Sequence, residues 1–303
     1  MSLHLNPHLR GIGFALAGFT SWVVADALIK FAAESHLAPY QIIGIMSAVA
    51  VVVMLFKARR VDAIKALWPK SMKGQIIVAL MTLGSNYCNV IALRHLPLTI
   101  FYIAVFTAPM LIAILSAYFL KEPLGWLKFL AIVIGFFGVV VAIDPFDVTS
   151  GGDLIGYAAA FGSSSCFAVN VTLTRFLTQS ESPDSLVFFN SLFQVFVSAV
   201  CAVLLVCPPI SLPILFILLA MGAFNLGGNF AYTLGVKYAP AATVAPFHYT
   251  QIISGTLVAF LVWHEMPKFH FWIGVVIIVA TGIYIARTAY KSAQAAQAGI
   301  APH

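Results

Sequence analysis

NYCNVIALRHLP, residues 86–97, and NFAYTLGVKYAP, residues 229–240, are two copies of one pattern. Asparagine opens each copy, a basic residue follows eight positions later, and proline closes it. The copies are 143 residues apart, and the same shift relates Glu122 in AYFLKEP to Glu265 in AFLVWHEMP, and GFALAGFTS (13–21) to GYAAAFGSS (156–164). A constant shift over several helices requires matching loop lengths, so the sequence indicates an internal duplication.

Composition places both copies in a membrane. Hydrophobic residues make up 61% of the 303 residues and charged residues only 9%, whereas a globular protein carries about 25% charged residues. The missing surface charge indicates that lipid faces most of the protein. The net charge of +6 falls at helix ends, so it is a topology signal rather than a nucleic-acid footprint.

A spanning helix needs about 20 mainly apolar residues, and ten such runs predict an all-α integral membrane protein with ten transmembrane helices. Prolines stand where several of the runs should begin. The predicted spans are Gly11–Ala33, Tyr40–Phe56, Gly74–Leu93, Leu98–Leu120, Leu124–Ile143, Gly152–Leu177, Ser185–Cys207, Leu212–Val236, Ala241–Val262 and Phe269–Arg287.

The distribution of lysine and arginine predicts the orientation. With the N-terminus in the cytoplasm, the inner loops and ends carry 13 of the 16 basic residues, so both termini are expected to be cytoplasmic. Each half then holds five helices, residues 1–147 the first five and 148–303 the second five with a frayed tail. Because five is odd, the halves lie inverted, as in secondary transporters; a duplicated bundle without a transport role is the alternative.

A glutamate before the fifth helix of each half gives the chain a family resemblance. It resembles the EamA-type members of the drug/metabolite transporter superfamily, through Glu122-Pro123, Trp126, Gly135 and Gly138 in the first half, and through Glu265, Pro267, Trp272, Gly274 and Gly282 in the second. Met266 separates glutamate from proline in the second copy. The resemblance implies a small-metabolite exporter of the bacterial inner membrane, most like the exporters of amino acids, including aromatic ones.

Polar residues inside the bilayer are costly and mark candidate sites. Asn86 and Asn89 share one face of the third helix with Thr82, and the repeat mates Asn225, Asn229 and Tyr232 have the same spacing on the eighth. Both faces lie near the midplane, where transporters bind substrate. We predict that they line the substrate site; hydrogen bonding that only joins helices is the alternative.

Further candidates lie on the other helices. His248, Tyr249 and Gln251 follow Pro246 on the ninth helix, and His248 is expected either to bind a carboxylate or take a proton, or to bond a neighbouring helix as a neutral group. An aromatic wall of Trp22, Tyr102 and Phe106 would suit a planar substrate, but ordinary membrane packing is the interpretation we favour for these residues. Ser164 either lines the cavity or lets helices approach closely.

Charged residues follow one another at four-residue intervals on the first helix. Asp26, Lys30 and Glu34 form either a mutually compensating ladder or an extracellular gate, and binding of an ammonium group by Asp26 is a further alternative. The candidates for gating or coupling are Asp26, Lys30 and His248. Glu122 and Glu265 are expected to cap the fifth and tenth helices.

These observations predict a secondary transporter that exports small metabolites. Amino acids are the expected substrates, and aromatic amino acids are the leading candidates. A membrane-embedded enzyme acting on a lipid-linked substrate and a channel are the alternatives. We expect no catalytic residues, no cofactor and no metal. The expected partners are the small-molecule substrate and the lipid bilayer, with no nucleic acid, and a monomer is compatible with this plan.

Overall fold

The computed structural model describes residues 7–35, 37–58, 67–119, 126–143, 153–177, 181–238, 247 and 249–297. Within these residues all regular structure is helical. The helices are α1 (Pro7–Glu34), α2 (Pro39–Lys57), α4 (Met72–His95), α5 (Leu98–Val105), α6 (Ala108–Phe119), α7 (Trp126–Ile143), α8 (Leu154–Leu177), α9 (Pro183–Leu204), α10 (Leu212–Tyr238), α12 (Thr250–Trp263) and α13 (Phe269–Gln297).

Proline and serine set several of the helix starts. Pro39 and Pro183 occupy the first turns of α2 and α9, where a missing N–H removes no helical hydrogen bond. The Ser182 side chain caps α9 by accepting a hydrogen bond from the backbone N–H of Ser185. Pro97 directly precedes α5, while Pro123 and Pro240 lie outside the described residues.

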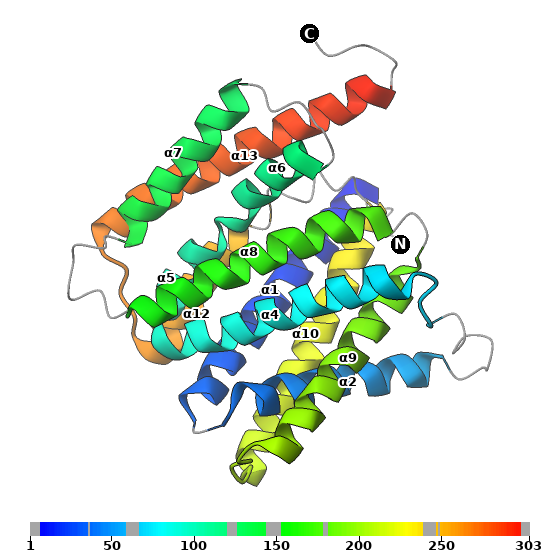
Figure 1. Cartoon of the computed structure of the whole chain (residues 1–303). Helices are drawn as coiled ribbons and strands as arrows, with labels where there is room; N and C mark the ends of the chain where they lie inside the picture. Colours follow the sequence, from blue (N-terminus) through cyan, green and yellow to red (C-terminus); the bar gives the residue numbers. More distant parts are fainter. Residues whose placement is uncertain are drawn as a thin grey trace, which may run out of the picture.

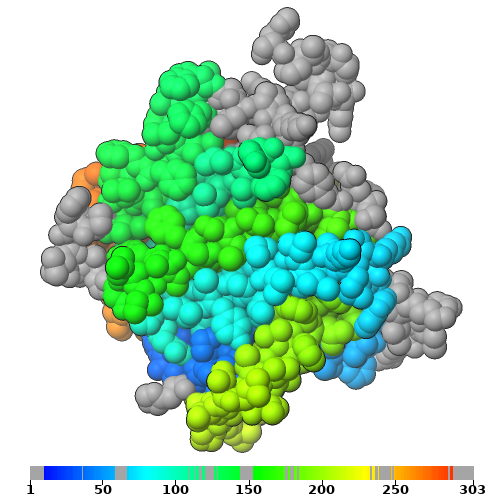
Figure 2. Space-filling view, viewed as in Figure 1, coloured from blue at the N-terminus to red at the C-terminus, as the bar shows by residue number. Residues whose placement is uncertain are grey.

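The helices are those of a multi-pass membrane protein. Six of them, α1, α2, α4, α8, α9 and α10, contain stretches long and apolar enough to cross a bilayer, and four shorter apolar segments occur at Leu98–Ile112, Phe129–Ile143, Thr250–Trp263 and Phe269–Ile285. Large apolar side chains cover the outside, including Ile77 of α4, Phe167 of α8 and Phe196 of α9. These three helices lie side by side on the face in Figure 2. The count of ten spans stays a prediction.

The fourth predicted span, Leu98–Leu120, is broken, which corrects the expectation of one continuous helix. Helix α5 ends at Val105 and α6 begins at Ala108. Pro109 has no backbone N–H, so the carbonyl of Val105 lacks its helical donor. The hydroxyl of Thr107 turns back to the carbonyl of Ala104 at 2.7 Å. In the second half, α12 begins at Thr250, the repeat mate of Thr107, and residues 241–246 and 248 of the ninth predicted span lie outside the described residues.

The packing of the helices follows the sequence repeat. Helix α1 packs on α10, α4 on α8, α2 on α9 and α7 on α13, the last pair along one edge of the molecule (Figure 1). A shift of 143 residues converts α1 into α8, α4 into α10, α2 into α9 and α7 into α13. If each helix is replaced by its repeat mate, the α1–α10 pair becomes the α8–α4 pair, and the α2–α9 and α7–α13 pairs are unchanged. This is the packing expected of two similar halves related by a two-fold axis.

Candidate functional site

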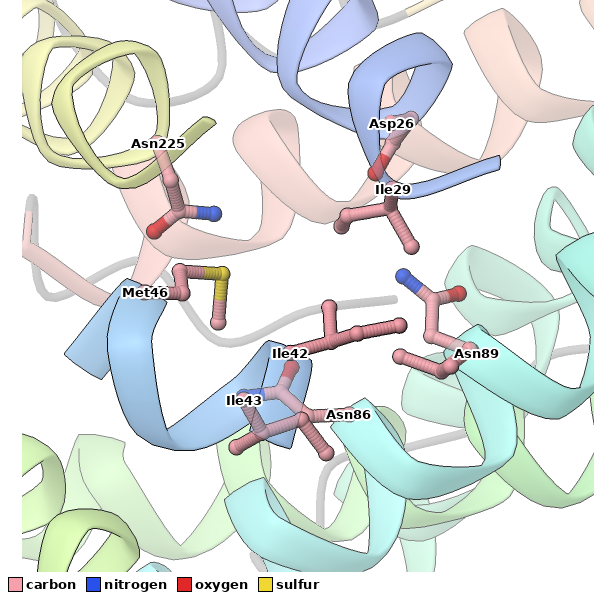
Figure 3. A pocket seen from close by; sticks show the side chains of 9 residues that line it. Asp26, Ile29, Ile42, Ile43, Met46, Asn86, Asn89 and Asn225 are labelled. Atoms are coloured by element: carbon pink, nitrogen blue, oxygen red, sulfur yellow. The ribbon is translucent and has the colours of Figure 1, made fainter. Parts of the chain in front are cut away.

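A small polar cavity lies where α1, α2, α4 and α10 meet (Figure 3). Its volume is about 30 Å³, which is room for one or two water molecules and too little for a metabolite. In this conformation it is therefore too narrow to hold a metabolite. The lining residues are Asp26, Ile29, Ile42, Ile43, Met46, Asn86, Asn89, Val90 and Asn225.

All four polar residues of this lining are candidates from the sequence. Asp26 comes from α1, Asn86 and Asn89 from α4, and Asn225 from α10. Figure 3 shows their side chains around one space, with the apolar residues of α2 facing them. Two residues of the predicted face on α4 and one of that on α10 therefore meet at a single cavity.

Each of these asparagines is held by a hydrogen bond on the side away from the cavity. Asn86 Nδ2 donates to Gln194 Oε1 of α9 at 2.6 Å. Asn89 Oδ1 accepts from the Ser163 hydroxyl of α8 at 3.5 Å. Asn225 Oδ1 accepts from Asn229 Nδ2 at 3.2 Å. In this arrangement Asn86 turns its Oδ1, and Asn89 and Asn225 their Nδ2, toward the cavity.

The carboxylate of Asp26 joins α1 to α5. Tyr102 donates its hydroxyl proton to Asp26 Oδ2 at 3.0 Å, and its side chain is buried. Tyr102 therefore lies behind Asp26 and reaches the cavity only through that carboxylate.

One turn further along α1, Lys30 forms a buried ion pair with Glu265. Lys30 Nζ lies 2.5 Å from Glu265 Oε1, and the side chains are 7% and 16% exposed. Glu265 also accepts hydrogen bonds from the backbone N–H groups of Leu98 and Thr99 and from the Thr99 hydroxyl. We call these four residues the Lys30–Glu265 latch, which ties α1 and the α12–α13 connection to the first turn of α5.

The latch corrects two expectations. Glu265 caps α5 rather than the tenth predicted helix, because the chain brings its carboxylate to the free N–H groups of Leu98 and Thr99. The ladder along α1 is replaced by contacts with other helices. Lys30 bonds Glu265 and lies 4.7 Å from the Trp263 ring centroid, and Glu34 accepts a hydrogen bond from Trp263 Nε1. Glu122 lies outside the described residues.

The aromatic candidate Trp22 packs in a separate cluster with Phe19 and Tyr232. Its ring centroid lies 5.8 Å from that of Phe19 and 5.4 Å from that of Tyr232. Asn229 donates to the backbone carbonyl of Asn225 as well as to its side chain. The cavity lining does not include Trp22, Asn229 or Tyr232. These residues lie on α1 and α10, where the two helices pack together.

The other candidates lie near the break between α5 and α6. Phe106 stacks on Tyr249, its repeat mate, with ring centroids 5.3 Å apart. Ser164 donates to the carbonyls of Ala104 and Ala160, and Gln251 donates to the carbonyl of Phe19 at 3.2 Å. These residues join helices. His248 lies outside the described residues.

Sequence reasoning missed Gln194 and the apolar wall from α2. The repeat mate of Gln194 is Val51, so comparison of the halves gives no signal there, and Ile42, Ile43 and Met46 resemble any lipid-facing residues. Within the described residues no three His, Cys, Asp or Glu side chains come together as a metal site, and Asp26 is the acidic residue of the cavity lining.

The family model described as "EamA-like transporter family" matches residues 9–143 and again residues 154–287. The chain belongs to the EamA-like transporter family. The two matches coincide with the two halves of the repeat and confirm the family resemblance.

Curated relatives include transporters of several kinds. The S-adenosylmethionine uptake transporter of Rickettsia conorii is 26% identical over 191 residues, which cover 62% of this chain and 63% of that protein. The match thus spans less than two thirds of the uptake transporter. The riboflavin transporter of Vibrio cholerae is 21% identical over 301 residues, 97% and 98% of the two chains. The pseudopaline exporter CntI of Pseudomonas aeruginosa is 25% identical over 278 residues, 90% and 94%.

A solved structure supports the fold alone. Described only as "Crystal structure of protein", it superposes with a TM-score of 0.65 at 18% identity and covers 92% of this chain and 98% of its own.

Proposed function

We propose that this protein is a secondary transporter that moves small metabolites by alternating access around the cavity at Asp26, Asn86, Asn89 and Asn225. The observation that carries the proposal is this cavity, built from polar residues of both halves inside a bundle of apolar helices. A polar group in the bilayer is costly and is retained where it serves a function. Inverted-repeat transporters bind their substrates near the membrane centre, between the repeats.

The finer proposal is export of amino acids, with aromatic ones first, across the bacterial inner membrane. The two halves divide at residues 147 and 148, both termini lie in the cytoplasm, and the protein acts as a monomer. The positive-inside rule supports the orientation. The relatives are named for both uptake and export, so the direction of transport rests on the family resemblance to amino-acid exporters.

The small volume of the cavity fits an alternating mechanism. At about 30 Å³ it must widen before a metabolite enters, and the helices that line it must separate. In the proposed orientation the Lys30–Glu265 latch lies at the outer end of α1, one turn beyond Asp26. We propose that the latch closes the outer side and that its opening admits or releases substrate there.

Counterflow in proteoliposomes tests this function. Purified protein is reconstituted in vesicles preloaded with unlabelled amino acid, and entry of labelled phenylalanine, tryptophan, threonine or methionine is followed. Saturable, transient accumulation of label is expected for the wild type and its loss is expected for a combined Asn86→Leu/Asn229→Leu variant. Empty vesicles are the control.

Two outcomes would overturn the proposal at different levels. Absence of counterflow for every amino acid, with folded protein, contradicts the substrate class. Label that equilibrates without saturation or accumulation indicates a channel and contradicts alternating access.

A further inference from the structure

We propose that the cavity recognises a zwitterion, with the ammonium group of the substrate at Asp26 and its carboxylate at the amide N–H groups of Asn89 and Asn225. This inference rests on the proposed function and names the chemistry of the ligand. It comes from the fixed orientations of the three asparagines together with the single carboxylate.

The acceptors of the cavity are Asp26 and Asn86. Tyr102 occupies Oδ2 of Asp26, and Figure 3 shows the carboxylate of Asp26 directed into the cavity. Asn86 uses Nδ2 to bind Gln194, so its Oδ1 is the atom free to face inward. A carboxylate and a carbonyl oxygen accept hydrogen bonds and attract positive charge, which is what an ammonium group with three donors requires.

The donors of the cavity are Asn89 and Asn225. Asn89 accepts from Ser163 through Oδ1, and Asn225 accepts from Asn229 through Oδ1. Both amide nitrogens are thereby turned inward, as Figure 3 shows. An NH₂ group carries two donors and no acceptor, so these two groups suit a carboxylate.

An α-amino acid satisfies both sets at once because it bears ammonium and carboxylate on one carbon. A simple amine leaves the two amides unpaired, and a simple acid places its charge against Asp26. An uncharged planar ring leaves the Asp26 carboxylate without a counter-charge. A buried polar group without a partner lowers affinity, so each of these ligands should bind more weakly than the zwitterion.

The apolar wall completes the site. Ile42, Ile43 and Met46 of α2 face the polar residues across the cavity. When the cavity widens, an apolar substrate side chain can lie against α2 while its charged head stays with α1, α4 and α10.

Competition against labelled phenylalanine in the counterflow assay tests the proposal. The competitors are unlabelled phenylalanine, phenethylamine, which lacks the carboxylate, and 3-phenylpropionate, which lacks the ammonium group. We expect both analogues to compete at least about tenfold more weakly than phenylalanine, as loss of a charged hydrogen-bonding partner implies. Equal competition by the three ligands overturns the zwitterion assignment and leaves transport standing, whereas absence of counterflow overturns both.

Variants then assign the two ends. Asp26→Asn should lower the affinity for phenylalanine and reduce the ratio of its affinity to that of 3-phenylpropionate. Asn89→Leu and Asn225→Leu should lower the affinity for phenylalanine and leave the affinity for phenethylamine unchanged. Asn170→Leu is the matched control, because Asn170 bonds Thr82 and the carbonyl of Val78 away from the cavity lining. The assignment would be contradicted if Asp26→Asn changed the affinity for 3-phenylpropionate and left the affinity for phenylalanine unchanged. The competition series on the wild type decides the question even where a variant does not fold.

Discussion

Helices α4 and α10 are repeat mates, yet they use their shared polar pattern differently. On α4, Asn86 and Asn89 line the cavity; on α10 only Asn225 does. Asn229, the mate of Asn86, instead bonds Asn225, and Tyr232, the mate of Asn89, packs against Trp22. The two copies of one sequence pattern therefore have different surroundings.

This difference is expected of an inverted-repeat transporter. Such a protein exposes its site to one side at a time when its halves adopt different conformations, and residues that match in sequence then have different neighbours. The repeat identifies helices that meet at the cavity, but it does not identify which of their residues line it.

The largest effect is expected at Phe106, where the halves do meet through repeat mates. Phe106 is 1% exposed and stacks on Tyr249. Phe106→Ala should lower the free energy of unfolding by about 3–5 kcal/mol, because it removes a buried ring and leaves a cavity. Denaturant unfolding in detergent, followed by circular dichroism, measures the change. Phe137→Ala on the exposed face of α7 is the control, and equal losses would contradict a packed contact between the halves.

The next effect concerns two ion pairs, that of Lys30 near the C-terminal end of α1 and that of Lys57 at the C-terminal end of α2. Lys30→Met should lower stability by about 3 kcal/mol, because it leaves the Glu265 carboxylate buried without its counter-charge. Lys57→Met removes a pair with Asp184 whose side chains are about half exposed, and should change stability by less than about 1 kcal/mol. Thermal unfolding of both variants compares them. A latch that contributes no more than the exposed pair would contradict its role as a closed contact.

A smaller effect separates Asn86 from Asn229 in transport. Asn86→Leu alone should reduce counterflow by about tenfold, because it removes a cavity acceptor and leaves Gln194 without its donor. Asn229→Leu should reduce counterflow by only a few-fold, because it acts on the cavity indirectly, by removing the hydrogen bond that orients Asn225. The initial rates of the two variants, at matched protein amounts, measure the difference. Equal losses would mean that both repeat mates act at the site.

The smallest effect lies outside the membrane spans, at Asp153. The backbone N–H of Gly156 lowers the pKa of this carboxylate, with the neighbouring His95 side chain adding to the effect. A lowered pKa stabilises the folded state above the unfolded pKa, and this contribution disappears as the pH falls through the folded value. Asp153→Asn should therefore be slightly less stable than the wild type at pH 7 and equally stable in acid below the lowered pKa. Unfolding midpoints measured from pH 7 to pH 3 test this, and a constant difference would contradict it.

Much of the fold is predictable from sequence because the bilayer imposes it. Apolar length and flanking prolines place α1, α2, α4, α8, α9 and α10 closely. The break at Phe106 and Thr107 was missed, since Pro109 lies inside an otherwise apolar run and its effect depends on whether another helix satisfies the freed carbonyl. The Ser164 hydroxyl of α8 lies 3.4 Å from that carbonyl, on Val105.

The candidate site is predictable in part for a similar reason. The cost of burying polar groups in lipid points to Asp26, Asn86, Asn89 and Asn225. It does not say whether such a group faces a cavity or another helix, because both satisfy its hydrogen bonds. Trp22 and Gln251, which the same reasoning selects, contact neighbouring helices and are not among the residues that line this cavity.

Substrate protection of residue 90 tests the central claim most directly. Val90 lines the cavity without a role in the proposed recognition. Val90→Cys is made in a background with Cys88, Cys166, Cys201 and Cys207 replaced by alanine, and its reaction with a small thiol reagent is timed in proteoliposomes. The account predicts that phenylalanine slows the reaction, with half-maximal protection near the concentration that half-saturates counterflow, and that phenethylamine protects at least about tenfold less well. An identical labelling rate with and without saturating substrate would contradict the assignment of this cavity as the transport site.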